Sequence, residues 1–482
     1  MIQTPVGYRS FAEGVSKLKQ VTGCDHRAAQ RYIIGAIAGA VPVKFLAAVV
    51  ALLDFCYLAQ MPRFNDNTLC RVEVMLCAFH TNKAAIITAG GRQGRRGPLD
   101  HWEVPKLELL QHIVRSIRTS GTIMQWTADV TEHAHITEIK HPACSGNNQD
   151  YYVQIARHLD CSDRCFRFDI ATRLTSVEQG SSGEEDEDPE DLEDEHKPDS
   201  EALHILHYYS PTGTVINYFE ITKEVASGTV PNTLLPHRIF ASPTMAFRLA
   251  NKPSLQTTID EASEAYGLAD LWLAVTNYFC RVNRTMQATL VTEGMQIWFK
   301  VQVQQPSYHN QQSLEPPQSL LASHFLLLAS CFSTLTTASQ WGYDFAIISQ
   351  TEQSDWPSSG LTGMFWDVNF PMYVYHLTGH NVVQVCLIFC LLHSDIFLAY
   401  IQCLNATVDN MYALKCAIQN NGTRVGEVIP LCYIRSPAHT IPHFRKEANP
   451  WLTLHTSYES SNEFWLNKYW SKESFYTLSL ST

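Results

Sequence analysis

The stretch NVVQVCLIFCLLHSDIFLAYIQCL, residues 381–404, decides the fold of the C-terminal half of the chain. It contains two apolar runs, each long enough for one strand and rich in β-branched and aromatic residues, on either side of a turn at 391–395. Strands that are apolar on both faces lie inside a packed protein. The stretch therefore predicts a hairpin of mostly buried strands.

Patterns on either side of this hairpin extend the β-rich region. IWFKVQV at 297–303 alternates apolar and polar residues, as half-buried strands do. GTRVGEVIPLCYI at 422–434 predicts another hairpin, and SNEFWLNKYWSKESFY at 461–476 predicts a closing amphipathic helix. We therefore expect residues 293–482 to form a β-rich C-terminal domain.

The segment before this domain, residues 203–292, is expected to be mixed. TGTVINYFEI at 212–221 is rich in residues typical of strands. A small helical unit around Gly267 is predicted by TMAFRLAN at 244–251, SLQTTIDEASEAY at 254–266 and LADLWLAVTNYF at 268–279. Two short helices at a glycine turn resemble a helix-turn-helix. The second helix has no Arg or Lys, which favours a packing unit over one that reads DNA.

The first 174 residues are expected to form a helical domain, so the fold class is α+β. Asp25 is the predicted N-cap of the first helix, and Asn67 or Thr68 is the predicted cap of the third. GGRQGRRGPLD, residues 90–100, predicts a loop rich in Gly and Arg. Apolar residues recur at helical spacing in residues 26–40, 43–60, 69–89, 106–121 and about 150–159.

The net charge of −12 lies in one place. Residues 178–201 hold thirteen Asp or Glu and one Lys, which leaves the rest of the 482 residues neutral on balance. Such a segment repels itself and has little to bury, so residues 175–202 are predicted to be a disordered linker between domains. The neutral remainder favours weak contact with DNA, and the acidic segment favours basic protein partners.

The composition indicates a soluble protein of the nucleus or cytoplasm, neither secreted nor in a membrane. The N-terminus lacks the apolar core of a signal peptide, and the fourteen cysteines are scattered, as reduced thiols are. The most apolar stretch, 33–59, is interrupted by Pro42, Lys44 and Asp54, and a membrane span needs about 20 apolar residues.

The densest cluster of residues able to do chemistry lies between 129 and 144. Its members are Asp129, Glu132, His133, His135, Glu138, His141 and Cys144. Glu132 and His135 are three residues apart, so both lie on one face of a helix. The cluster has three interpretations: a zinc site of His133, His135, His141 and Cys144, one carboxylate of a magnesium site, or a polar helix surface. Cys161 and Cys165 are candidates for further zinc ligands.

Common catalytic motifs are missing from the chain. It contains no G-x-x-x-x-G-K-[ST] loop, no G-x-G-x-x-G after a strand, no G-x-S-x-G elbow and no H-E-x-x-H. An ATPase, a dehydrogenase or a common hydrolase is therefore disfavoured.

Several of these segments together resemble the Plavaka transposases of basidiomycete, mushroom-forming fungi, which belong to the Kyakuja-Dileera-Zisupton superfamily. The resemblance covers nearly the whole chain. It runs through HRAAQRYIIGAIAGAVP (26–42), FLAAVVALLDFCYLAQMP (45–62), WEVPKLELLQHIVRSIRTSG (102–121), residues 126–140, GNNQDYYVQIARHLD (146–160), residues 237–271 and TSYESSNEFWLNKYWSKESFY (456–476).

The resemblance implies an RNase H-like transposase core in which two Asp and one Glu hold two Mg²⁺ or Mn²⁺ ions. Residues 1–174 would be its helical insertion and last helix, with Glu132 as a vestigial third metal carboxylate and Asp129 as the less favoured choice. His135 would orient that carboxylate. The helical series begins near residue 10, which leaves no room for the strands that bear both Asp. We therefore expect a C-terminal part of a transposase that binds no metal and is not an enzyme.

Two alternatives remain open. The acidic segment 178–201 favours a protein-interaction scaffold that binds basic partners such as histone tails. The histidines His133, His135 and His141 favour a metal-dependent hydrolase. The sequence does not specify an oligomeric state or a target DNA.

Overall fold

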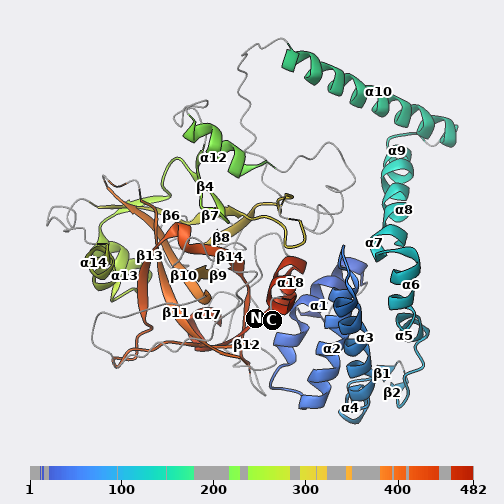
Figure 1. The fold of residues 1–482 in the computed structure, drawn as a ribbon, viewed down its shortest axis with the longest axis horizontal. Helices are drawn as coiled ribbons and strands as arrows, with labels where there is room; N and C mark the ends of the chain where they lie inside the picture. Colours follow the sequence, from blue (N-terminus) through green and yellow to red (C-terminus); the bar gives the residue numbers. More distant parts are fainter. Residues whose placement is uncertain are drawn as a thin grey trace. The chain divides into compact units, whose positions relative to one another are not determined.

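A computed structural model describes most of the chain (Figure 1). The described residues are 11, 14–15, 21–178, 216–227, 237–282, 294–322, 343–349, 380–408, 412–444 and 457–480, apart from the single positions 95, 148, 311, 393 and 395. The predicted linker lies outside the described residues from 179 onward.

Helices make up the N-terminal part of the chain, as predicted. They are α1 (Gly23–Ile37), α2 (Val43–Ala59), α3 (Asp66–Asn82), α4 (Ala84–Thr88), α5 (Pro105–Leu110), α6 (Ile113–Ser120), α7 (Ile123–Trp126), α8 (Asp129–Ala134), the π-helix η2 (His135–Lys140), α9 (His141–Cys144) and α10 (Tyr151–Glu178). Within the Gly/Arg segment, β1 (Gln93–Gly94) and β2 (Gly97–Pro98) pair as a short hairpin.

The predicted helix caps are wrong by a few residues. Thr22, not Asp25, is the N-cap of α1, and Asp25 is the third residue of the helix, where its carboxylate accepts a hydrogen bond from the Thr22 backbone at 2.8 Å. Before α3, Asn65 caps the helix by accepting from Thr68 N at 2.8 Å, while Asn67 lies inside it. A capping box in α1 and reciprocal bonds between Asn65 and Thr68 in α3 place the caps two or three residues before the predicted ones.

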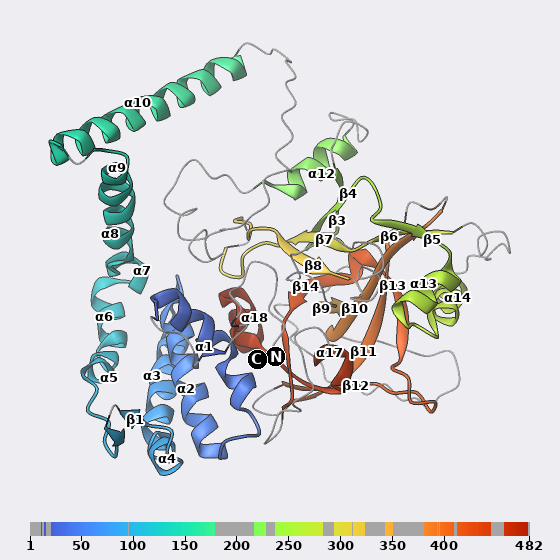
Figure 2. The ribbon, with the colours of Figure 1, turned by 180° about the vertical axis from the view of Figure 1, so that it is seen from behind.

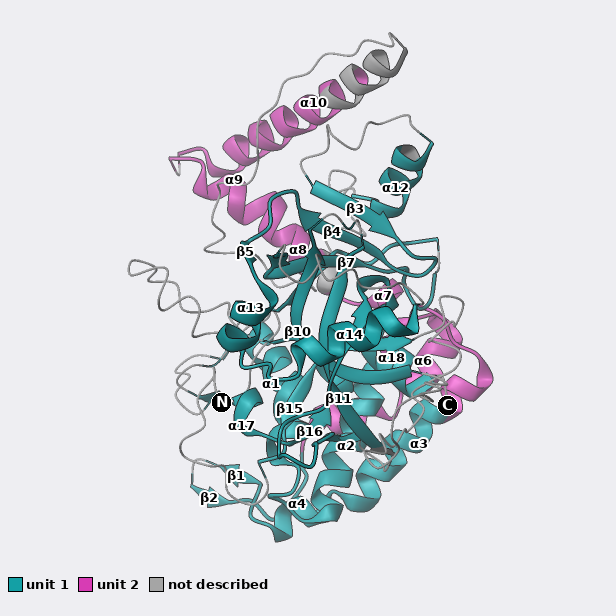
Figure 3. Ribbon diagram, turned by 90° about the vertical axis from the view of Figure 1, so that its left-hand side faces the viewer, with its two compact units in different colours: residues 1–58, 71–103, 198–482 teal, residues 59–70, 104–197 magenta. Residues whose placement is uncertain are grey.

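Two compact units make up the chain (Figure 3). One unit contains residues 1–58, 71–103 and 198–482, and the other contains residues 59–70 and 104–197. The second unit contains the start of α3, the short helices α5 to α9 with η2, and α10. The predicted helix at 106–121 is interrupted at Gln111 and His112, between α5 and α6, and the helix predicted near 150–159 is longer than expected.

Strands dominate the C-terminal region, which confirms the α+β class. The elements are α12 (Tyr218–Ala226), β3 (His237–Ala241), β4 (Ala246–Ala250), β5 (Leu255–Thr257), α13 (Ile259–Tyr266), α14 (Leu271–Arg281), β6 (Met295–Trp298), β7 (Lys300–Gln304), β8 (Gln318–Leu321), β9 (Phe345–Ser349), β10 (His380–Leu391), β11 (Leu398–Val408), β12 (Tyr412–Cys416), β13 (Gly426–Pro430), the 3-10 turn η6 (Leu431–Tyr433), β14 (Ile434–Ala438), β15 (Thr440–Pro442), α17 (Ser457–Ser460), β16 (Glu463–Leu466), the 3-10 turn η7 (Lys468–Trp470) and α18 (Lys472–Leu480).

The predicted central hairpin is confirmed. Strands β10 and β11 pair antiparallel from Val383 opposite Cys403 to Phe389 opposite Leu398. Every residue of β10 is buried, because the strand pairs with β11 along one edge and with β9 and β6 along the other. One apolar cluster, which includes Trp298, covers one face of this sheet, and helices α13 and α14 cover the other (Figure 2).

A second sheet has the strand order β3-β4-β7-β8, and α12 packs against it. Two predictions are wrong here. The strand expected at 212–221 is the start of α12 in its described part, because Asn217 accepts hydrogen bonds from Phe219 N and Glu220 N and so begins a helix. The helix expected at 244–251 is β4, whose Phe247 and Leu249 enter the core from one face. The predicted helical pair around Gly267 is confirmed as α13 and α14.

The C-terminal segment departs from two further predictions. Residues 422–434 do not form a hairpin, because β13 pairs with β11 whereas β14 pairs with β9. The amphipathic helix expected at 461–476 is divided into β16, η7 and α18. Among the described residues, no helix is long and apolar enough to cross a membrane.

Candidate functional site

The predicted site residues lie in consecutive short helices, α8, η2 and α9 (Figure 1). Glu132 is exposed near the end of α8, and His135, also exposed, begins the π-helical turn. Single π-helical turns are rare and frequently occur at functional sites. Asp129 is the first residue of α8, and its side chain lies outside the described residues.

The helical spacing brings Glu132 and His135 to neighbouring positions, as expected, and separates the histidines of the zinc alternative. His133 and His135 are two residues apart, so their side chains leave the helix in different directions. His141 and Cys144 are exposed in α9, and Cys161 and Cys165 are exposed on α10. In the described part of the chain, no group of three or more His, Cys, Asp or Glu side chains could hold a metal ion.

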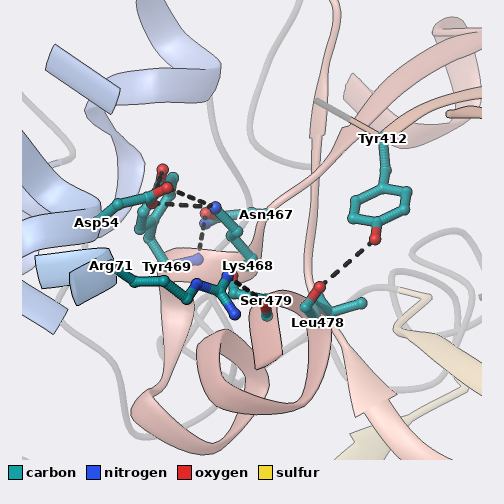
Figure 4. A network of polar contacts seen from close by, with 8 residues as sticks. All are labelled: Asp54, Arg71, Tyr412, Asn467, Lys468, Tyr469, Leu478 and Ser479. Carbon is teal, nitrogen blue, oxygen red and sulfur yellow. Dashed lines mark hydrogen bonds and ion pairs between the residues drawn. The ribbon is translucent and has the colours of Figure 1, made fainter. Parts of the chain in front are cut away.

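One polar cluster was not predicted from the sequence. It joins Asp54 of α2 to residues of η7 (Figure 4). Lys468 Nζ lies 2.9 Å from Asp54 Oδ1, and the Tyr469 hydroxyl donates to the same carboxylate at 2.6 Å. The Tyr57 hydroxyl donates to the backbone oxygen of Tyr469. A lysine, an aspartate and a tyrosine therefore meet in a largely buried position.

The chemistry of this cluster is that of an anchor. Burial, with the Asp54 carboxylate as the next cause, holds the pKa of Tyr469 well above its usual range, so the hydroxyl stays protonated and donates. The Lys468 ammonium also lies 5.0 Å from the Phe475 ring centre, over its face. Since each charge has a partner, the cluster holds α2 to the C-terminal segment.

Other contacts seat the first helices on the same C-terminal segment. Asn467 Nδ2 donates to the backbone oxygen of Arg31 in α1 at 2.9 Å. Arg71 of α3 donates to the backbone oxygen of Ser479 at 2.6 Å. Helices α1 and α2 and the β-rich body are therefore parts of one compact unit.

A second carboxylate, the half-buried Asp270, fixes α14 against the large sheet. It accepts hydrogen bonds from the Tyr400 hydroxyl, from Gln419 Nε2 at 2.8 Å and from Gly426 N at 3.1 Å. Burial, followed by the nearby Asp270, raises the pKa of Tyr400 far above its usual range. Three donors satisfy this carboxylate, so it too has a structural role.

Comparison with known proteins gives one match. Residues 219–420 match the family model described as a domain of unknown function, DUF6830. This range begins in α12 and contains β3 to β12, including the central hairpin. No curated protein and no solved structure matches the chain.

Proposed function

We propose that this chain is a catalytically incomplete relative or fragment of a Plavaka-type DNA transposase, which binds DNA or protein and does not itself cleave DNA. The resemblance in the sequence supports this proposal across both the helical and the β-rich regions. Three of the quoted series, 26–42, 45–62 and 102–121, fall on helices α1, α2 and α5 to α6.

The surroundings of Glu132 support the loss of catalysis. The family pattern places the third metal-binding carboxylate at this residue. Two-metal transfer of a phosphoryl group needs ions about 4 Å apart, held by several carboxylates. Glu132 is exposed on α8, and Glu138, six residues later, does not share its face. Asp129, three residues before Glu132, is the other carboxylate of α8, so this helix supplies at most two carboxylates and not the three that the family pattern uses. Mg²⁺ held by so few protein ligands would be bound weakly.

A DNA-cleavage assay tests this proposal. The purified chain is incubated with supercoiled plasmid and Mg²⁺ or Mn²⁺, and we expect no nicking and no linear product. Glu132→Ala should leave this result unchanged and alter the free energy of unfolding by no more than about 0.5 kcal/mol, because the side chain is exposed. Glu138→Ala, which removes an exposed carboxylate six residues further along, is the matched control. Metal-dependent cleavage that Glu132→Ala abolishes and Glu138→Ala preserves would refute the proposal.

A protein-interaction scaffold is the second candidate, favoured by the concentration of negative charge in residues 178–201. Acidic segments of this length attract basic partners, and the attraction weakens as salt screens it. A pull-down with histone tails, with and without residues 178–201, tests this function. Equal recovery of the tails by both proteins would count against it.

A further inference from the structure

The Gly/Arg hairpin carries a local excess of positive charge. No Asp or Glu occurs from residue 74 to residue 99, whereas the same stretch contains Lys83, Arg92, Arg95 and Arg96, and the next acidic residues are Asp100 and Glu103. Outside the acidic segment the chain as a whole is neutral. The hairpin β1–β2 is therefore a local concentration of cations on a neutral background.

The structure holds one of these cations in a fixed orientation. The Arg92 guanidinium lies 4.9 Å from the ring centre of Trp102, and its Nε donates to the backbone oxygen of His101 at 2.7 Å. Phe79 supports the indole edge-on, with ring centres 5.7 Å apart. The two Nη groups of Arg92 have no partner among the described residues.

This arrangement is suited to an oxyanion. An arginine that is stacked and bonded through Nε presents its two Nη groups as a preformed fork, which loses little entropy when it binds phosphate. The exposed Arg96 lies at the tip of the same hairpin. Lys83, whose Nζ lies 3.0 Å from His80 Nδ1, is the remaining cation of the stretch 74–99. Burial and the Lys83 charge lower the pKa of His80, so His80 remains neutral and adds no charge.

The backbone of the hairpin also permits close approach. Gly94 and Gly97 are paired in β1 and β2, and Gly97 has a φ of 124°. Residues without side chains let a phosphate backbone come near the main-chain N–H groups. Repeated cations on a glycine-rich hairpin fit a polymer of phosphates better than a single small anion.

We propose that the β1–β2 hairpin is a contact surface for the phosphodiester backbone of nucleic acid, with Arg92 as the preformed phosphate fork and Arg96 as its partner at the tip. Arg92 is a phosphate-binding residue, and Trp102 and the His101 carbonyl position it. The contact reads no base, so affinity depends on salt and little on sequence. This inference rests on the binding part of the proposed function and names the partner and the surface.

Fluorescence anisotropy with labelled single-stranded and double-stranded oligonucleotides tests the proposal on the full chain. We expect binding at about 50 mM salt that weakens steeply as salt rises. Arg92→Ala should weaken binding about 3- to 10-fold and lower the slope of log affinity against log salt by about 1. Arg92→Lys should restore part of the affinity, because a lysine keeps the charge and loses the fork.

Controls separate phosphate binding from general effects of charge and folding. Arg115→Ala removes an exposed arginine of α6 and should leave affinity within about 2-fold, since it lies outside the hairpin. Thermal melting of each variant identifies any loss of fold. The proposal is overturned if the wild type does not bind, if Arg92→Ala and Arg96→Ala bind as the wild type does, or if polyglutamate of equal charge competes as well as DNA. None of these outcomes changes the cleavage result, so the two proposals fail separately.

Discussion

Replacing Asp344 with Asn is expected to stabilise the protein at about pH 8 and to leave it unchanged at about pH 4. Asp344 directly precedes β9, and its Oδ2 accepts a hydrogen bond from Leu321 N at 2.7 Å. Burial raises the pKa of this carboxyl from 3.8 to about 7. Asparagine keeps an acceptor for Leu321 N and removes the charge that the folded protein disfavours.

The magnitude follows from the difference between the folded and unfolded pKa. Because the folded pKa is the higher one, the contribution of Asp344 to stability is fully present below about pH 4 and is lost as pH rises through about 7. A rise from 3.8 to about 7 corresponds to about 4 kcal/mol in the free energy of unfolding. Asp344 retains some contact with solvent, so we expect a gain of about 2–4 kcal/mol for Asp344→Asn at high pH.

Urea unfolding of the wild type and the variant at about pH 4, 6 and 8 measures this gain, and the difference between the two proteins cancels all other titrating groups. Asp100→Asn removes an exposed carboxyl and should follow the wild type at every pH. If Asp344→Asn differs from the wild type by the same amount at all three pH values, the pKa of the Asp344 carboxyl is not raised by folding.

Two further sets of substitutions test the contacts that hold α1 and α2 to the C-terminal region. Asp54→Asn leaves the Lys468 ammonium without its counter-charge and should lower the free energy of unfolding by about 3 kcal/mol, whereas adding Lys468→Met should recover most of it; a double variant no better than the single one would contradict this. Gly35→Ala places a Cβ 2.9 Å from Ile441 Cβ and should cost about 1–3 kcal/mol in a thermal melt. Gly23→Ala, with nothing within 4 Å, should instead gain up to about 1 kcal/mol, and equal melting of the two variants would exclude the close contact.

The sequence predicted elements whose pattern has one explanation. The central hairpin was found because two long apolar runs flank a short turn, and α2 was found because its apolar run lies between two prolines. The predictions were wrong where aromatic and small residues are compatible with either a helix or a strand. β4 (Ala246–Ala250) contains residues common in helices, and only its pairing with β3 and β7 selects the strand.

The candidate site residues also differ in whether their neighbours can be predicted from the sequence. Neighbours along one helix, such as Glu132 and His135, follow from spacing alone. The Asp54 cluster could not be predicted, because no sequence pattern in α2 indicates that Asp54 pairs with a lysine of η7. Arg92 is an intermediate case: the charge of the Gly/Arg segment is visible in the sequence, whereas its stacking on Trp102 is visible only in the fold.

The bond between Tyr57 and Tyr469 spans 412 residues, and this separation has a consequence for the order of synthesis. A ribosome adds about 5–20 residues per second, so it needs roughly 20–80 s after it has made α2 to synthesise η7, which holds α2 in the folded protein. During that interval the apolar surface of α2 has no C-terminal partner to cover it. We expect chaperones, or temporary contacts within the nascent chain, to cover this surface until residues 467–480 have been synthesised.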